Sequence, residues 1–547
     1  MFEKEKTGAP AGLYSNESPK YKWKVLSTVI FGIFMVILDT TVVNVAFQTI
    51  RQEFGGNIND SQWVISIYVL VLGITTPLAG FLADRFGAKK IYLGGLGLFA
   101  LGSLMCGLSP NLGLLIAARA IQGMGGGIAM PLGTALLLQA FPPKEHGTAL
   151  GIFGIAALIA PAIGPILGGW LVDLHIWRVI FFINPPIGLI GVVLGIFFLR
   201  EGKSEQAPGF DTAGVISEVI GFGAILYAAS IAANQGWTSP ETLIFLAIGL
   251  VGLVFFGIHE LTRAKSPLLD LRLFKNRIFL NATLLGYVST VALFGAEFLM
   301  PIYLQLLRGH TALQTGFILL PMAIAGGVCV TLSGRIYDKI GPRPLLVTGF
   351  AILIVNTWQL SQIRADSSTG WILFLLVLRG LALGLTVQTT FVTALSVVPR
   401  KELARGSSLT NATRLVVQSI GVAVLATVLA STISPEVKIA QNQFHNIPAA
   451  AGQFAGLCEK IPTAVLPDRQ VGQDDSGKLM TSIKPAQNFP VLAGESMPDA
   501  GIIDQACQEN IAGFEKAYLV TFYAAILAFL LAILLPGWPG KWNGRQG

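Results

Sequence analysis

Long apolar segments alternate with short polar ones along almost the whole chain. A transmembrane helix needs about 20 predominantly apolar residues, and fourteen segments reach roughly this length. Their expected bounds are 25–47, 63–82, 91–108, 112–141, 148–172, 179–199, 214–232, 242–259, 279–306, 315–336, 345–362, 371–398, 407–431 and 518–535. The pattern predicts an all-α membrane protein with 14 transmembrane helices.

Composition excludes the main soluble alternatives. Of the 547 residues, 53% are hydrophobic and 12% are charged, whereas soluble domains carry about 25% charged residues. So little charge cannot cover a water-soluble multidomain enzyme. The 62 glycines and 28 prolines are too few and too irregular for a collagen-like or low-complexity chain.

The net charge of +7 comes from basic clusters between the apolar segments. A nucleic-acid binder would gather its basic residues on one face or arm, so no nucleic-acid partner is expected. If the N-terminus is in the cytoplasm, the segments on the cytoplasmic side contain many more Lys and Arg residues than the short loops on the outer side. This is the asymmetry that the positive-inside rule requires. We therefore expect a multi-pass protein of the cell (inner or plasma) membrane with both termini cytoplasmic.

The spacing of the segments divides the chain into parts. We expect a cytoplasmic N-terminal segment (1–24), an N-terminal six-helix bundle (25–199), linkers with two extra transmembrane helices (200–277), a C-terminal six-helix bundle (278–538) that includes a long extracytoplasmic loop (432–513), and a cytoplasmic tail (539–547).

An internal repeat underlies this division. Residues 80–90 read GFLADRFGAKK, and residues 334–343 read GRIYDKIGPR. Glycine, acid, base, glycine and base recur in one order, as Gly80, Asp84, Arg85, Gly87 and Lys89 and again as Gly334, Asp338, Lys339, Gly341 and Arg343. The repeat predicts two pseudo-symmetric six-helix bundles plus an inserted helix pair. In such proteins the substrate site lies between the halves, near the membrane midplane.

These residues resemble the major facilitator superfamily, and within it the fourteen-helix drug:proton antiporter family. The 80–90 loop resembles the superfamily signature between helices 2 and 3. Residues 38–46 (LDTTVVNVA), 119–126 (RAIQGMGG) and 177–186 (WRVIFFINPP) resemble motifs of helices 1, 4 and 6. The resemblance covers nearly the whole chain.

The fifth predicted helix resembles the motif associated with antiporters. Its residues are Gly151, Gly164, Pro165, Gly168 and Gly169, while the family's central glycine falls at Ala160. Small residues let helices approach closely, and proline favours a bend. The resemblance implies export, with this helix as a hinge or seal; ordinary helix packing is the alternative.

The charged residues inside the predicted helices include Asp39, Arg119, Glu297 and Arg379. A charge within the bilayer is costly unless it is paired or faces water. Asp39 and Arg119 lie at similar depth, so we expect a pair in which Asp39 takes the coupling proton. A permanent structural salt bridge is the alternative, and both interpretations stay open for Glu297 with Arg379.

The acids of the repeated loops follow helix ends. A helix N-terminus stabilises a carboxylate, so Asp84 is expected to face the helix start at 405–408, and Asp338 the one at Gly147 and Thr148. These contacts would form a conformational latch that joins the inner ends of the halves when the cavity opens outward.

Substrate-cavity candidates are polar or aromatic residues on helices that should line the cavity: Trp63, Tyr68, Gln122, Tyr303, Gln305, Gln388, Arg414 and Gln418. An apolar pocket with a few such groups suits hydrophobic or amphiphilic compounds. For each of them alone, simple packing is the favoured interpretation. For Glu218, in the inserted pair, we expect a structural or headgroup-level role.

Cys458 and Cys507 both lie in the predicted outer loop. An outer compartment permits disulfides, so we predict a disulfide between them. The cysteines show no metal-site spacing and no catalytic constellation stands out. We expect no metal, no cofactor other than the coupling proton, and no enzyme activity.

The sequence therefore predicts proton-coupled export of small hydrophobic or amphiphilic compounds by alternating access, as in a multidrug efflux transporter. A proton-coupled nutrient importer and a non-transporting membrane sensor or scaffold are the alternatives. The expected partners are the small-molecule substrate and the lipid bilayer, and the sequence is silent on a periplasmic adaptor.

Overall fold

The computed structural model describes residues 20–55, 58–201, 211–262, 267–364, 366–434, 437, 471–473, 479–481 and 500–535. In this part of the chain, thirteen spans are long and apolar enough to cross a membrane. Helix α10 has 26 residues and forms the remaining predicted span. All fourteen predicted segments are therefore helical, and the predicted fold class is confirmed.

The helices fall into two halves and a middle pair. The first half contains α1 (Tyr21–Phe54), α2 (Ile58–Phe86), α3 (Ala88–Leu108), α4 (Leu112–Ala140), α5 (His146–Asp173), α6 (Val179–Phe182) and α7 (Asn184–Phe198). The middle pair is α8 (Thr212–Gln235) and α9 (Pro240–Thr262). The second half contains α10 (Arg277–Ile302), α11 (Ala312–Ile340), α12 (Pro342–Ser361), α13 (Thr369–Leu395), α14 (Leu403–Ser431) and α18 (Ala500–Ile533).

Short elements connect these helices. They are the 3-10 turns η1 (Pro143–Glu145), η2 (Leu271–Lys275) and η4 (Arg400–Glu402), and the π-helical turn η3 (Tyr303–Leu307) directly after α10. Strands β1 (Val471–Gln473) and β2 (Leu479–Thr481) pair antiparallel, with Val471 opposite Thr481.

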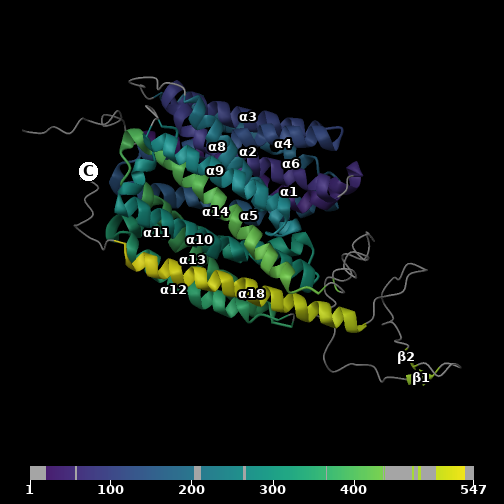
Figure 1. Cartoon of the computed structure of the whole chain (residues 1–547). Coiled ribbons are helices and arrows are strands. Elements are labelled where there is room, and N and C mark those ends of the chain that lie inside the picture. The colour runs from purple at the N-terminus through teal and green to yellow at the C-terminus, as the bar shows by residue number, and fades with distance from the viewer. Residues whose placement is uncertain are drawn as a thin grey trace, which may run out of the picture.

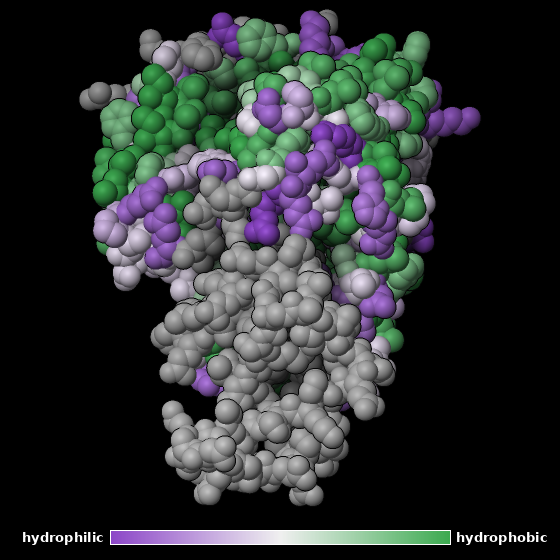
Figure 2. All heavy atoms as spheres, turned by 90° about the vertical axis from the view of Figure 1, so that its right-hand side faces the viewer, coloured by the Kyte–Doolittle hydropathy of each residue, from purple (hydrophilic) through white to green (hydrophobic). Residues whose placement is uncertain are grey.

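The two halves lie side by side, with α5 and α14 between them (Figure 1). Helix α5 belongs to the first half but packs along α11 of the second, and α14 packs against α2 in the reciprocal way. We call the end of the bundle that contains Asp84 and Asp338 the motif end. Figure 2 looks onto the other end, where hydrophobic residues cover much of the upper rim and hydrophilic residues gather toward the middle.

The inserted pair covers the junction of α2 with α14. Helix α8 contacts both of them. A Cβ atom at Gly73 of α2 would lie 2.3 Å from a methyl carbon of Leu226, and the indole of Trp237 donates a hydrogen bond to Thr427 of α14 at 3.1 Å. The pair is thus packed against both halves, at one flank of the molecule.

Two boundaries differ from the predictions. Helix α18 begins at Ala500, so residues 500–513 are helical and do not belong to the predicted 432–513 loop. The apolar criterion missed them because this first part of the helix is polar. The predicted helix over 179–199 is interrupted at Ile183, before Asn184 and two prolines, and a proline has no N–H for an intrahelical bond.

Candidate functional site

The most deeply buried charges of the first half form an ion pair. Asp39 lies on α1 and Arg119 on α4, and Arg119 Nη1 donates to Asp39 Oδ2 at 2.5 Å. The side chains are 0% and 1% exposed, respectively. The predicted pair is present, and each charge compensates the burial cost of the other.

Two amides complete the surroundings of the carboxylate. Gln122 and Asn184 each donate to Asp39 Oδ1 at 2.8 Å. Asn184 is held in turn by a bond to the hydroxyl of Ser103 at 3.0 Å, and Ser103 donates to the carbonyl of Phe181 at 2.8 Å. Four helices, α1, α3, α4 and α7, thus converge on one carboxylate.

Arg119 has further contacts besides the ion pair. Its Nε donates to the carbonyl of Val64 at 3.0 Å, and its Nη1 to Gln122 Oε1 at 2.7 Å. Its guanidinium carbon lies 4.1 Å from the ring centroid of Tyr68, a distance at which the face of the ring attracts a cation. The guanidinium therefore keeps partners when Asp39 is neutral.

The sequence did not assign Asn184 or Ser103 to this site. Asn184 opens α7 directly after the break at Ile183, and its side chain is buried in the core, where it is 1% exposed. The available signal was the motif at 177–186, because an amide followed by two prolines at a helix break is unusual in a buried span.

The matching site in the second half centres on Arg379 of α13, which is also fully buried. Its Nη2 donates to the carbonyl of Ala292 at 2.9 Å, and its Nη1 to Asn356 Oδ1 at 3.3 Å. Glu297 lies on α10, the same helix as Ala292, but its side chain is outside the described residues. A Glu297–Arg379 pair stays a prediction.

At the motif end, Asp338 caps the start of α5. Its carboxylate accepts from the backbone N–H groups of Gly147 and Thr148, both at 2.8 Å, and from the Thr148 hydroxyl at 2.6 Å. This is the contact that the repeat predicts. It joins α11 of the second half to α5 of the first.

Asp84 makes the related contact between α2 and α14. The carboxylate accepts from Arg405 Nε at 2.5 Å, and the backbone N–H of Gly80 donates to the Ser408 hydroxyl at 3.0 Å. The predicted partner segment is correct. The hydrogen bond that we observe for Asp84 comes from the Arg405 side chain, whereas the predicted donors were the free backbone N–H groups of the helix start.

The other repeated residues support the turns. Gly87 and Gly341 have φ of 99° and 80°, a region that favours glycine, and each directly precedes the next helix. Lys89 Nζ donates to the carbonyl of Ile196 at 2.8 Å. Lys339 and Arg343 are exposed, and Arg85 is half-buried.

Glycines of α5 lie where no side chain would fit. A Cβ at Gly151 would be 2.7 Å from the carbonyl oxygen of Val330 on α11, and one at Gly164 would be 2.1 Å from Thr41 Oγ1 on α1. Cβ atoms at Gly168 and Gly169 would be 3.1 and 3.0 Å from backbone atoms of α1 and α11. Pro165 lies within α5 between these contacts.

The structure separates the cavity candidates. Tyr68 and Gln122 belong to the Asp39 network. Trp63 stacks on Tyr227 of the inserted pair with ring centroids 5.8 Å apart, and the hydroxyl of buried Tyr303 donates to the carbonyl of Arg364 at 2.6 Å.

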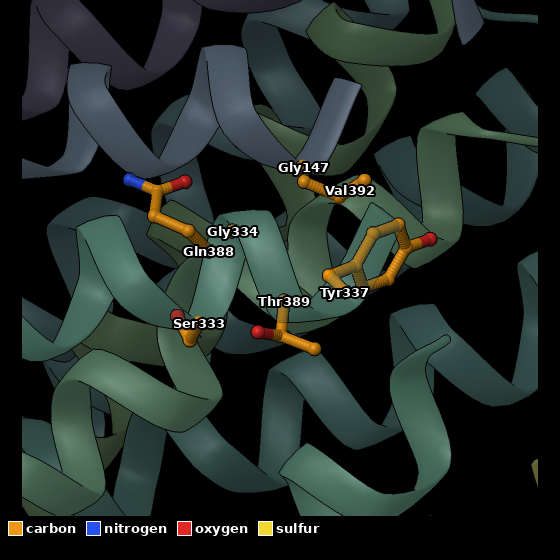
Figure 3. A pocket seen from close by; sticks show the side chains of 7 residues that line it. All are labelled: Gly147, Ser333, Gly334, Tyr337, Gln388, Thr389 and Val392. Carbon is orange, nitrogen blue, oxygen red and sulfur yellow. The ribbon is translucent and has the colours of Figure 1, made fainter. Parts of the chain in front are cut away.

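The remaining candidates also lie apart. Gln305 is exposed, Gln418 is half-buried on α14, and Arg414 lies 5.9 Å from the ring centroid of Phe391. Gln388 lines a narrow crevice between α5, α11 and α13 (Figure 3), together with Gly147, Ser333, Gly334, Tyr337, Thr389 and Val392. This crevice has no room for a water molecule, so it is a packing gap at the motif end.

The cysteines fall into two groups. Cys507, on α18, is disulfide-bonded, whereas Cys106 and Cys329 are free thiols. Cys458 lies outside the described residues, so its pairing with Cys507 stays a prediction. Within the described part of the chain, His, Cys, Asp and Glu form no group of three or more that could hold a metal ion.

Comparison with known proteins identifies the fold and the family. The profile described as the Major Facilitator Superfamily matches residues 29–422. The chain belongs to this superfamily. It is thus a multi-pass membrane transporter, from a family of transporters and not of enzymes.

The relatives of this transporter include proteins whose names refer to drug resistance. The multidrug resistance protein Stp of Mycobacterium tuberculosis is 35% identical over 407 residues, which cover 74% of this chain and 75% of Stp. The lincomycin resistance protein LmrB of Bacillus subtilis is 30% identical, with 76% and 87% covered. The MFS-type transporter YhcA of Bacillus subtilis is 36% identical, with 75% and 77% covered.

A solved structure shares the fold. A bacterial homologue of the human lysosomal transporter Spinster, in an inward-facing and unoccupied conformation, superposes with a TM-score of 0.56 at 15% identity. The superposition covers 96% of this chain and 100% of that one.

Proposed function

We propose that this transporter exports small hydrophobic or amphiphilic compounds in exchange for protons. The observation that carries the proposal is the Asp39–Arg119 pair, which is buried, charged and held by the amides of Gln122 on α4 and Asn184 on α7. A site that needed only rigidity could use apolar packing at lower cost. A carboxylate whose charge depends on a movable partner can instead take and release a proton.

The exchange cycle follows from that pairing. When the cavity opens outward, a proton neutralises Asp39 and releases Arg119 to the Val64 carbonyl, Gln122 and the Tyr68 ring. When the cavity opens inward, the proton leaves, the pair reforms, and the site is restored for a substrate. Proton and substrate then oppose each other, and linkage makes this opposition reciprocal.

The contacts at the motif end support a closed state of that end. Asp338 at the start of α5 and Asp84 at Arg405 each join one half to the other. We infer from the Lys and Arg distribution that this end faces the cytoplasm together with both termini. In our proposal these two contacts are the latch that holds the inner side shut while the outer side opens.

Two further features support export by a drug-efflux type of transporter. Glycine contacts of α5 reach from α1 to α11, so this helix can seal the two halves against each other as they rock. The names of the relatives Stp and LmrB refer to resistance to several drugs and to lincomycin. We infer a substrate of that chemical kind, with the proton gradient as the driving force.

The proposal is tested by dye efflux from a drug-sensitive host that expresses the transporter. We expect efflux that collapses when the proton gradient is dissipated, and that is lost in Asp39→Asn. Asp173→Asn, at an exposed carboxylate at the end of α5, is the control and should pump normally. Normal efflux by Asp39→Asn, or gradient-driven uptake by the wild type, would overturn the proposal.

A further inference from the structure

A second buried acid lies in the inserted helix pair, away from Asp39. Glu218 of α8 is 0% exposed, and neither oxygen of its carboxylate has a hydrogen-bond partner among the residues that the structure describes. Burying an ionised carboxylate without donors costs several kcal/mol, on the order of the effective penalty for one buried ion. A purely structural role would leave that cost without compensation.

Its neighbour is another buried acid. Glu260 of α9 is 2% exposed, and among the described residues its carboxylate has only weak contacts with the backbone N–H groups of Leu268 and Leu269, none with the distance and angle of an ordinary hydrogen bond. Glu218 and Glu260 are within electrostatic range of each other. Two ionised carboxylates at such a buried place repel each other, so the pair is stable only when it holds a proton.

The start of α8 brings in a third carboxylate. A Cβ at Gly214 would lie 2.7 Å from Asp211 Oδ2 and 2.9 Å from Glu260 Oε1. Asp211 already has partners, because it accepts from the backbone N–H of Gly214 and from His259 Nε2, both at 2.9 Å. Its negative charge adds to the repulsion on Glu260, and therefore favours the protonated form of the glutamate pair.

Arg405 of α14 connects the glutamate pair with the contact between α2 and α14. Its guanidinium is within electrostatic range of Glu260 and at the same time bonds Asp84 across the α2–α14 contact. A Cβ at Gly80 would lie 2.9 Å from the Arg405 Cα, so the two helices touch at this point. One cation thus interacts with both the latch carboxylate and Glu260.

We propose that Glu218 and Glu260 form a second proton-binding site, in the inserted pair, whose occupancy is linked to the Asp84–Arg405 contact. While Asp84 holds Arg405, the cation is compensated and the glutamate pair keeps its proton. When α2 and α14 separate, Arg405 loses Asp84, and Glu260 becomes the nearest alternative carboxylate. An ionised Glu260 is then stabilised, and the proton leaves.

Linkage gives the direction of the effect. Because the closed motif end favours the protonated pair, low pH should favour closure and high pH should favour opening. One proton linked to the equilibrium changes it by up to about tenfold per pH unit. The charged groups around the pair are Asp211 before α8, His259 on α9, Arg405 on α14 and Asp84 on α2, while Arg272 and Lys275 of η2 are exposed to solvent.

The test measures opening of the motif end in the full-length protein in lipid nanodiscs, without substrate or gradient. Spin labels at the exposed positions Lys90 and Lys401 report the separation of the halves there. The comparison is made in an Asp39→Asn background, so a failed result here says nothing about the proton site of the transport cycle.

We expect the Asp39→Asn protein to open as pH rises, and the E218Q/E260Q variant in that background to lose this dependence. The control E241Q removes an acid at the other end of the same pair, where Glu241 bonds Tyr227 at 2.9 Å, and should keep it. Equal pH dependence with and without E218Q/E260Q, or no pH dependence in the Asp39→Asn protein, would overturn the proposal.

A second measurement does not depend on the behaviour of the Asp39 variant. The infrared spectrum of the otherwise wild-type protein should contain a protonated-carboxyl band that E218Q/E260Q lacks and that E241Q retains. If E218Q/E260Q leaves the carboxyl band unchanged, the pair holds no proton and the proposal is wrong.

Discussion

Asp39 and Arg119 are together because neither charge is tolerable alone at that depth. The free-energy cost of burying each charge can be inferred from the sequence, since each is an isolated charge in a long apolar segment. The pair could therefore be predicted. The roles of Asn184 and Ser103 could not, because neutral polar residues are common in membrane helices, and it is the packing of α7 against α1 and α3 that brings Asn184 to the carboxylate.

The pairing of Glu218 with Glu260 is another feature that could not be predicted from the sequence. From the sequence alone it is one acid in an extra helix, and a structural role is the simplest interpretation. Its partner Glu260 lies at the polar end of the next helix and carries no signal of burial. The antiparallel packing of α8 on α9 creates the pair, and single-sequence patterns do not contain that register.

Removal of one partner of the Asp39–Arg119 pair should cost stability. Asp39→Asn leaves the Arg119 charge buried, which costs up to about 3–5 kcal/mol, reduced by the bonds to Val64 and Gln122 and by the Tyr68 ring. Asp39→Asn combined with Arg119→Gln should be more stable than Asp39→Asn alone, and neither should transport. Thermal unfolding of the purified variants measures this; equal unfolding temperatures for the single and double variants would contradict it.

Helix α5 is the element on which the closed motif end depends. The sequence showed its glycines and the resemblance to an antiporter motif, but not which helices they face. The structure places Gly147 and Gly151 against α11 and Gly164 and Gly168 against α1. Which neighbour a small residue contacts depends on the crossing of the helices, and that is a property of the whole bundle.

Gly334→Ala should force α11 away from α5. A Cβ there would lie 2.2 Å from the Gly147 carbonyl oxygen, a backbone atom that can move only with its helix. We expect an open motif end and strongly reduced efflux, measured by the same spin-label separation and by dye efflux. Gly94→Ala is the matched control, since a Cβ at Gly94 meets nothing within 4 Å; impaired efflux in both variants would contradict the argument.

Asp338→Ala should weaken the same contact by a different route. It removes the acceptor for the first N–H groups of α5, a loss that costs about 0.5–2 kcal/mol at a helix start, and so shifts the transporter toward an open motif end. Asp366→Ala, at an exposed position in another loop, is the control. A closed motif end in Asp338→Ala, seen as an unchanged separation of spin labels at Lys90 and Lys401, would count against the latch.

The architecture of the whole molecule followed largely from the sequence. Apolar segment length gave the spans, and the repeated loops gave the two halves, because both signals are local. The early start of α18 was missed, since a helix that extends into water needs no apolar run. The interior of the transport path is the other gap, because polar candidates such as Tyr303 and Trp63 proved to be packed away from the Asp39 network.

The predicted disulfide between Cys458 and Cys507 can be tested chemically. Cys507 is disulfide-bonded, and we expect peptide mapping without reduction to recover its peptide joined to the one that contains Cys458. The free cysteines Cys106 and Cys329 should be recovered as single alkylated peptides after denaturation. Alkylation of Cys458 in the unreduced protein would show that the predicted pairing is wrong.

The exchange of a proton on Asp39 for substrate can be measured in proteoliposomes, as proton movement that depends on the substrate. The purified transporter is reconstituted with a pH-sensitive dye inside, and an amphiphilic cationic dye is added as the substrate. We expect proton movement opposite to the substrate in the wild type and in Asp173→Asn, and none in Asp39→Asn or in Asp39→Asn with Arg119→Gln. Substrate-coupled proton movement of wild-type size in Asp39→Asn would contradict it.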